Sequence, residues 1–334
     1  MATLRNLRET DAHRHGLFEI SFAVWVLLAT SAFAADPSVA DSQSGPLTGR
    51  VTARVRIPYK PERLSSLTAA KNGDAVIGVA TWKHRGRILR VSRKPPYLAG
   101  REVPDAIETV TVTDDGRTCY LQRDIVCFRN AGAETRVRPA GAVIDRLYHS
   151  GGHVYALDRS AGSFFRVGLS SVQRIPTPFP ITAVAIGPDG AALVGAQDIC
   201  WLSNAESTPN HCSHARGMGA FGPADDAAST ASFAVVIHLP EREAVLVARN
   251  GSVMHVALPM RVQRADVRDR GSVWIAGADD GGSLAVADIS SRGARMLRVN
   301  ARLSGGAMIA GAGPDSLVLL DADARTALFV TIRR

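Results

Sequence analysis

Residues 181–204 read ITAVAIGPDGAALVGAQDICWLSN, and this stretch decides the fold. Short runs of apolar residues are separated by the turn sequence GPDG and by a second polar break at QD. Short alternating runs bounded by Gly, Pro or Asp are typical of strands joined by hairpin turns. The stretch therefore predicts three consecutive antiparallel strands.

The same pattern recurs along the chain. Clear copies are IETVTVTDDGRTCYLQRDIVCFRN from Ile107 and RLYHSGGHVYALDRSAGSFFRVGL from Arg146, and weaker copies begin at Ser66, Ser232, Val262 and Ala307. The first turns of the units contain Gly73, Gly116, Gly152, Gly190, Glu241, Gly271 and Asp315. One unit therefore covers about 40 residues, and that period with several strands per unit is typical of β-propeller blades.

We therefore predict an all-β fold, a seven-bladed β-propeller over residues 50–334. Six or eight blades stay open as alternatives because the units from Ser232 and Val262 are faint. Small residues in first strands, such as Ala183 and Ala185, predict a crowded centre. The last unit has room for three strands, whereas the strand-like segment RVTARVRIP (50–58) has no partner in the first unit. We expect this N-terminal strand to complete the last blade and close the ring.

The spacing of the turns is uneven in one place. Glu241 follows Gly190 by 51 residues, and the excess falls in the segment from Asn204 to Thr230. This segment is rich in Gly, Ala, Ser and Pro and has no periodic pattern. We interpret it as an insertion on one face of the ring, where binding residues of a regular scaffold are usually found.

Two phrases carry a resemblance to known propellers. AIGPDGAALVGAQDICWL (185–202) and RDRGSVWIAGADDG (268–281) resemble blades of bacterial NHL-type, lactonase-type and streptogramin-lyase-like propellers. The resemblance covers residues 66–334 and is one of architecture. The Glu/Asn/Asp calcium set and the His-Gly catalytic segment of the enzymatic members cannot be placed on this sequence.

The N-terminus has the pattern of an export signal. Arg5, Arg8 and Arg14 precede an apolar stretch over residues 20–33, which ends in the A-x-A pattern of residues 32–34. The apolar stretch is shorter than the roughly 20 residues that span a bilayer. We expect a signal peptide over residues 1–34, a flexible leader over 35–49, and a periplasmic or secreted protein. A retained anchor is the alternative, and no later segment is apolar enough to span a membrane.

The chain carries a formal net charge of +8. The basic and acidic residues of the signal region cancel, so the mature chain keeps this charge. The basic residues are scattered, and export argues against a nucleic-acid partner. We expect a monomer whose partner is a protein or an anionic surface or polysaccharide.

The four cysteines fall into two local pairs. Export permits disulfides, and four cysteines allow three connectivities. We favour Cys119–Cys127 and Cys200–Cys212. A three-residue turn about Arg123 would place Cys119 directly opposite Cys127 on neighbouring strands.

Candidate binding residues lie mostly in the segment from Asn204 to Thr230. They are His211, His214, Arg216, Phe221, Asp225 and Asp226, joined by His149 near the central funnel. Two histidines beside Cys212 resemble a zinc or copper site, but an oxidised Cys212 would leave only a weak one, so we predict no metal there. His149 has a side chain suited to a general base, although no nucleophile or orienting acid can be assigned by spacing.

These features predict an exported binding or protein-interaction module. No catalytic residue is assigned, and the sequence requires no cofactor. The alternative is a periplasmic metal-dependent hydrolase, lactonase or lyase with its site in the central funnel, where calcium or magnesium would be the cofactor.

Overall fold

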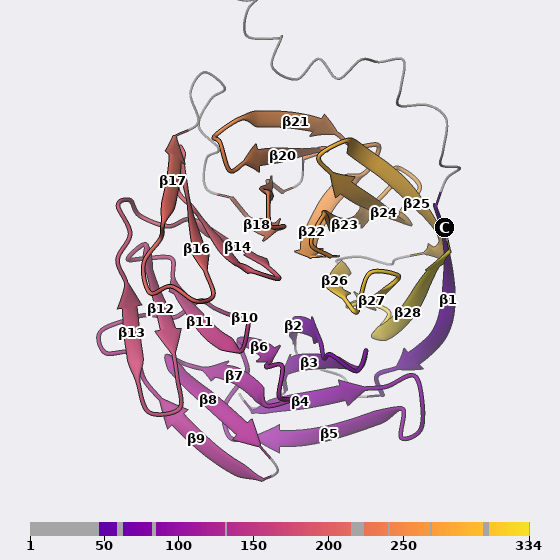
Figure 1. The fold of residues 1–334 in the computed structure, drawn as a ribbon. Coiled ribbons are helices and arrows are strands. Elements are labelled where there is room, and N and C mark those ends of the chain that lie inside the picture. Colours follow the sequence, from indigo (N-terminus) through magenta and orange to yellow (C-terminus); the bar gives the residue numbers. More distant parts are fainter. Residues whose placement is uncertain are drawn as a thin grey trace, which may run out of the picture. The chain divides into compact units, whose positions relative to one another are not determined.

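The described part of the chain consists of β-strands that follow one another in antiparallel groups of four (Figure 1). The computed structural model describes residues 47–58, 63–81, 85–130, 132–214, 224–239, 241–267, 269–302 and 307–333. All of them belong to the unit Pro46–Arg334. The predicted signal peptide and most of the predicted leader lie outside the described residues. Within the described ranges, no helix is long and apolar enough to cross a membrane.

Three of the sheets have four strands each. Their strands are β2 (Arg63–Ala69), β3 (Ala75–Ala80), β4 (Gly86–Val91) and β5 (Leu98–Val103); β6 (Thr109–Val112), β7 (Thr118–Gln122), β8 (Ile125–Asn130) and β9 (Ala133–Val137); and β10 (Arg146–Ser150), β11 (His153–Asp158), β12 (Ser163–Val167) and β13 (Val172–Ile175).

Two further sheets each combine two such groups. One holds β14 (Ala183–Gly187), β15 (Gly190–Val194), β16 (Asp198–Ser203) and β17 (His211–His214) with β18 (Asp226–Ser229), β19 (Phe233–Ile237), β20 (Glu243–Ala248) and β21 (Val253–Ala257). The other holds β22 (Arg261–Val267), β23 (Ser272–Ala278), β24 (Ser283–Ser290) and β25 (Gly293–Arg302) with β26 (Ala307–Gly311), β27 (Ser316–Asp321), β28 (Thr326–Arg333) and β1 (Leu47–Arg56). Short parallel pairings, β14 with β18 and β1 with β25, join the groups.

The first turn of most groups contains a glycine that the sequence marks. Gly73 and Gly116 have φ angles of 82° and 81°, in the left-handed region that favours glycine. These turns reverse the chain between the first and second strands, so their spacing along the sequence measures the length of a group.

The hydrophobic cores lie between neighbouring groups. One cluster joins Cys119, Leu121 and Phe128 of the β6–β9 group to Val154 and Phe165 of the β10–β13 group. A four-stranded sheet of this size cannot cover both of its faces alone, so each group buries its faces against the groups on either side. Figure 1 shows the resulting ring, with the first strand of each group nearest the centre.

The predicted closing strand is confirmed. β1 pairs antiparallel with β28 from Thr48 opposite Arg333 to Arg56 opposite Thr326, and it is the outer strand of the group β26–β28. It begins at Leu47, within the end of the predicted leader.

The predicted insertion is wrong in its main part. The segment from Asn204 to Thr230 contains β17, the outer strand of one group, and β18, the first strand of the next. Glu241 lies between β19 and β20, in a second turn, whereas the first turn of that group lies at Ala231. Ala231 follows Gly190 by 41 residues and precedes Gly271 by 40, so the spacing is even. The sequence DAAS of β18 has low strand propensity, which is why it does not read as a strand.

One predicted disulfide is confirmed. Cys200 of β16 lies opposite Cys212 of β17, and the two form a disulfide. The bond covalently links β17, the outer strand of this group, to the neighbouring strand β16.

The second predicted disulfide, Cys119–Cys127, is wrong. The turn between β7 and β8 has two residues, Arg123 and Asp124, so that Gln122 pairs with Ile125. Cys119 is then opposite Phe128, and Cys127 is opposite Tyr120. A register difference of one residue places side chains on opposite faces of a sheet. The two thiols are free and buried, each in the core on a different side of the group.

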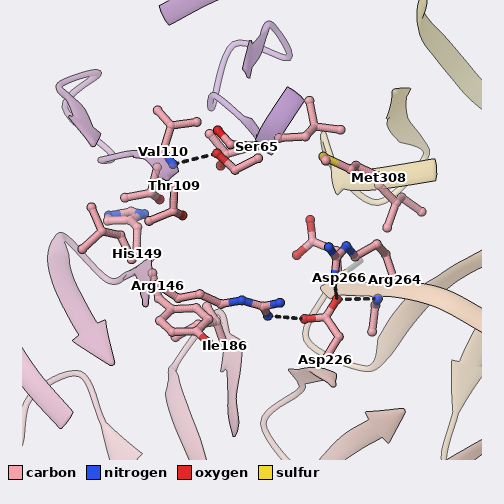
Figure 2. A pocket seen from close by; sticks show the side chains of 18 of the residues that line it. Ser65, Thr109, Val110, Arg146, His149, Ile186, Asp226, Arg264, Asp266 and Met308 are labelled. Atoms are coloured by element: carbon pink, nitrogen blue, oxygen red, sulfur yellow. Dashed lines mark hydrogen bonds and ion pairs between the residues drawn. The ribbon is translucent and has the colours of Figure 1, made fainter. Parts of the chain in front are cut away.

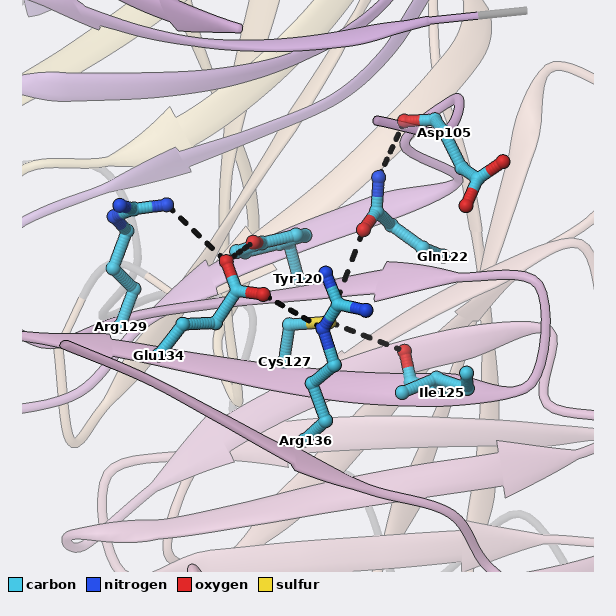
Figure 3. Close-up of polar contacts among 8 residues, drawn as sticks. All are labelled: Asp105, Tyr120, Gln122, Ile125, Cys127, Arg129, Glu134 and Arg136. Carbon is cyan, nitrogen blue, oxygen red and sulfur yellow. Dashed lines mark hydrogen bonds and ion pairs between the residues drawn. The ribbon is translucent and has the colours of Figure 1, made fainter. Parts of the chain in front are cut away.

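Polar groups surround the thiol of Cys127 (Figure 3). It lies 3.9 Å from Oε1 of Gln122 and 4.0 Å from the carbonyl oxygen of Ile125. On the same face, Glu134 accepts hydrogen bonds from Tyr120, Arg136 and Arg129. Burial raises the pKa of Cys127 to about 11 and that of Cys119 to about 12, so both stay protonated near neutral pH.

Removing β1 should destabilise the ring. A chain beginning at Tyr59 loses the buried side chains of Leu47, Val55 and Ile57 and exposes the edge of β28. Burial of one large aliphatic side chain contributes about 1.5–3 kcal/mol, so we expect a fall in Tm of at least about 10 °C. Thermal unfolding followed by circular dichroism measures it. A chain beginning at Pro46 keeps β1 and is the control; equal Tm values would contradict a closing role.

Thiol counting tests the cysteine assignment. In 6 M guanidinium without reductant, about two thiols per chain should react with Ellman's reagent, and the native protein should react much more slowly because Cys119 and Cys127 are buried. Cys127→Ala should lower the count in guanidinium by one. A count of zero in the unfolded parent chain would show that Cys119 and Cys127 do form a disulfide, contrary to the register.

Candidate functional site

The candidate functional site is a cavity of about 550 Å³ at the centre of the ring. Residues of the first strands β2, β6, β10, β14, β18, β22 and β26 line it. The volume suits a small molecule. Figure 2 shows side chains from strands far apart in the sequence converging on this space.

The sequence predicted a centre crowded with small residues, and this prediction is wrong. Ala183 and Ala185 lie in the core cluster that also contains Ala227 and Val236 of the next group. These small side chains let two groups pack closely. The residues that turn toward the centre are in large part polar or charged.

A charged contact forms one wall of the cavity (Figure 2). Nη1 of Arg146 donates to Oδ1 of Asp226 at 3.0 Å, which joins β10 to β18. Oδ2 of Asp226 accepts from the backbone N–H of Ala265 at 3.2 Å and lies 3.9 Å from Nη1 of Arg264. Burial opposes the charge of Arg146, but Asp226 and Tyr148 outweigh it and raise the pKa of Arg146. Arg146 is therefore a permanent cation in the cavity wall.

A neutral polar wall lies beside β6. Ser66 accepts from the backbone N–H of Val110 at 2.8 Å, whereas the hydroxyl oxygen of its neighbour Ser65 is buried and has no hydrogen-bond partner among the described residues. Nε2 of His149 is likewise buried without a hydrogen bond to any described group. Figure 2 shows Ser65, Thr109 and His149 on the same side of the cavity. Buried polar atoms in proteins are nearly always hydrogen-bonded, so these two atoms mark a place that accommodates a polar ligand group.

His149, which the sequence places near the central funnel, lines the cavity from β10. Its Nε2 atom is 3.9 Å from Oδ2 of Asp114, in the turn after β6. Burial lowers the pKa of His149, and the charges of Asp114 and Asp115 oppose this only in part. His149 is therefore mainly neutral at pH 7.

The other predicted site residues are dispersed. Asp226 lies in the cavity wall, and Oδ2 of Asp225 accepts from the backbone N–H of Leu239 at 2.8 Å. His211 and His214 are exposed on β17, the outer strand of its group. Arg216 and Phe221 lie outside the described residues.

Both outer histidines have local partners. Nε2 of His211 is 2.6 Å from the carbonyl oxygen of Arg249, and Nδ1 of His214 is 2.7 Å from Oδ1 of Asp198. Cys212 between them is in the disulfide. Across the described ranges, no three His, Cys, Asp or Glu side chains are grouped closely enough to hold a metal ion.

Sequence reasoning missed the arginines and the serine of the cavity. Arg146, Arg264 and Ser65 all belong to first strands, β10, β22 and β2. A partial signal was present, since Arg63, Arg146 and Asp226 are ionisable residues at the beginnings of β2, β10 and β18. It becomes a site only when the strands are known to surround a common axis.

Comparisons with known proteins support the fold. No family model matches the chain, and no curated protein matches its sequence. Among solved structures, virginiamycin B lyase from Staphylococcus aureus superposes with a TM-score of 0.64 at 8% identity, covering 85% of this chain and 99% of the lyase. The β-propeller domain of Cps50 (Swd1) from Myceliophteria thermophila gives 0.61 at 11% identity, covering 86% of this chain and 100% of the domain.

A chain of the mitotic checkpoint complex gives a TM-score of 0.62 at 10% identity, covering 85% of this chain and 96% of the other. The chain is a β-propeller. The likeness to streptogramin-lyase-like propellers is thus confirmed at the level of architecture. Identities this low concern the fold alone, because propellers of unrelated function share it.

The buried imidazole predicts a pH dependence. Between the lowered pKa of folded His149 and its value of about 6.5 in the unfolded chain, only the unfolded chain binds the proton. The free energy of unfolding should therefore fall as the pH decreases through about 6.5. His149→Asn should make this decrease smaller in urea titrations at pH 7.5, 6.5 and 5.5. The exposed His255 provides the control variant His255→Asn; the same slope in all three proteins would show that His149 does not contribute.

Proposed function

We propose that the protein is an exported β-propeller that acts as a binding module and takes its ligand in the central cavity. The observation that carries the proposal is a cavity of small-molecule size whose wall contains two buried atoms without a hydrogen-bond partner among the described residues, Ser65 Oγ and His149 Nε2. A ligand that supplies these hydrogen bonds removes an energetic cost of leaving buried polar groups unpaired.

The proposed site differs from the one expected on residues 204–230. That segment contains β17 and β18, and among its described candidate residues Asp226 alone lines the cavity. The first strand of every group contributes residues to the cavity wall, so the cavity exists only in the assembled ring.

The proposed blade count is seven. The described strands make six consecutive groups of four, from β2 to β25, and a further group of β26, β27, β28 and β1. The repeat of about 40 residues in the sequence supports the same count.

Export is part of the proposal. It is supported by the basic, apolar and A-x-A segments of residues 1–34 and by the disulfide Cys200–Cys212, since disulfides persist mainly in oxidising compartments. A periplasmic or secreted monomer that binds a protein or an anionic surface or polysaccharide is consistent with the net charge of +8. Other propellers of this fold are found in protein complexes, among them the mitotic checkpoint complex and the complex of BBS1N with ARL6DN.

A hydrolase, lactonase or lyase is the second candidate. The observation in its favour is the neutral imidazole of His149 in the cavity wall, 3.9 Å from a carboxylate oxygen of Asp114, which are the groups that general-base catalysis uses. Recovery of a bound compound unchanged after incubation supports the binding module, whereas its conversion, lost in His149→Asn, supports the enzyme.

A thermal-shift panel tests the binding function. Neutral sugars, sugar acids, amino acids and short carboxylates at 10 mM should include at least one compound that raises Tm by a few degrees, because a ligand that binds only the folded state stabilises it. Ser65→Ala should reduce that shift, since it removes a hydroxyl of the cavity wall. The control is Ser207→Ala, an exposed serine between β16 and β17. Absence of any shift, or an equal shift in Ser65→Ala, would contradict a site in the cavity.

A further inference from the structure

The carboxylates of the cavity wall share one arrangement. Four acidic side chains line the cavity, and each accepts a hydrogen bond from a backbone N–H group. The pairs are Glu108 with Arg123 N at 3.1 Å, Asp145 with Arg159 N at 2.6 Å, Asp226 with Ala265 N at 3.2 Å, and Asp266 with Gly311 N at 2.7 Å. Such bonds satisfy part of the acceptor capacity of a carboxylate and anchor it to the wall.

Arg146 and Arg264 of the same wall are more accessible than the carboxylate of Asp226. The side chains of Arg146 and Arg264 keep 29% and 33% of their surface exposed, against 12% for Asp226 between them. A guanidinium has five N–H donors. Arg146 uses one on Asp226, and the 3.9 Å contact of Arg264 is an ion pair that is too long for a hydrogen bond. Between Arg146 and Arg264, the guanidinium groups are therefore more open to an entering molecule than the carboxylate of Asp226.

Beside β6, and toward the other end of β10 from Arg146, the lining offers a hydroxyl group and an imidazole. Ser65 Oγ and His149 Nε2 are the buried atoms without a described partner, and Thr109 lies between them in Figure 2. Hydroxyl groups can both donate and accept, so they suit a serine hydroxyl and an imidazole nitrogen of either tautomer. The two walls therefore favour a molecule with an anionic end and a hydroxyl-bearing end.

Resting on the proposed binding function, we propose that the ligand of the central cavity is a hydroxylated carboxylate of the sugar-acid class. Its carboxylate lies against Arg146 and Arg264, and its hydroxyl groups bond with Ser65 and His149. Guanidinium groups are well matched to carboxylates because two parallel N–H groups can bind the two oxygens. Asp226 is the counterion that the ligand carboxylate replaces in part.

Calorimetric titration of the purified protein with D-glucuronate and with D-glucose tests the proposal. The two compounds differ in a carboxylate in place of a hydroxymethyl group. Glucuronate should bind at least about tenfold more tightly than glucose, since charge-assisted hydrogen bonds exceed neutral ones by an energy of that order. Arg264→Gln should remove most of the difference. The matched control is Arg101→Gln, an exposed arginine of β5 outside the cavity.

A variant that is expected to bind more tightly separates a loss of ligand contacts from misfolding, because a misfolded protein would not gain affinity. Asp226→Asn keeps an oxygen that can accept from the Ala265 N–H but removes the charge that competes for Arg146. It should bind glucuronate several-fold more tightly and leave glucose unchanged. Weaker glucuronate binding in Asp226→Asn would overturn the proposal, because Asp226 would then be a direct ligand group.

The experiments distinguish a wrong sugar-acid assignment from a wrong binding function. If glucose or another neutral compound binds as tightly as glucuronate and Ser65→Ala weakens it, the cavity is a binding site and the sugar-acid assignment is wrong. If no compound of the panel binds, the binding function itself is wrong. Tighter binding of glucuronate that depends on Arg264 supports both.

Discussion

The pairing of β1 with β28 is the constraint on which the ring depends. The register shifts between Val51 and Ala53, and such a bulge changes the face on which later side chains lie. Leu47 and Val51 accordingly pack into the core shared with β23–β25, whereas Val55 and Ile57 pack into the core shared with β2–β4. One strand thus contributes to the cores on both sides of its group. Without it, the first and last parts of the chain would meet over an incomplete interface.

Closure also creates the site. Because each group packs against two neighbours, the first strands are held around a common axis, and their side chains converge although they are distant in sequence. Arg146 and Asp226 are 80 residues apart and form an ion pair across this space. A partly buried ion pair adds little net stability, because desolvation offsets much of the attraction. Its importance lies in where it puts guanidinium groups, with the carboxylate held by a backbone N–H of the next group.

Much of the architecture could be predicted from local pattern. Turn glycines at steady intervals marked most of the groups, and the unpaired segment near residue 50 indicated how the ring closes. The failures have specific causes. DAAS of β18 consists of residues with low strand propensity, and only its neighbours in the ring make it a strand. The pattern consequently places the first turn of this group at Glu241, which lies in its second turn, and predicts an insertion in a segment that contains β17 and β18.

Of the two predicted disulfides, one is present and the other is excluded by a difference of one residue in turn length. Cys200 and Cys212 lie opposite each other, as their setting suggested. For Cys119 and Cys127, a turn of two residues in place of three shifts the register by one position and sends the thiols to different cores. Turn length is decided by how the strands pack on their neighbours as well as by turn residues, so spacing alone could not settle it.

The sequence by itself determined the all-β repeat, the closing strand, the position of most turns and one disulfide, because these follow from periodicity and from contacts between adjacent strands. Only the tertiary structure decided the site. Ser65, His149, Arg146, Asp226 and Arg264 belong to four different groups. His149 and Asp226 were candidates for other reasons, and the other three resemble ordinary strand residues in their own units. They acquire a common environment only when the ring is closed, since burial, shared counterions and unpaired hydrogen-bonding atoms are properties of the assembled centre.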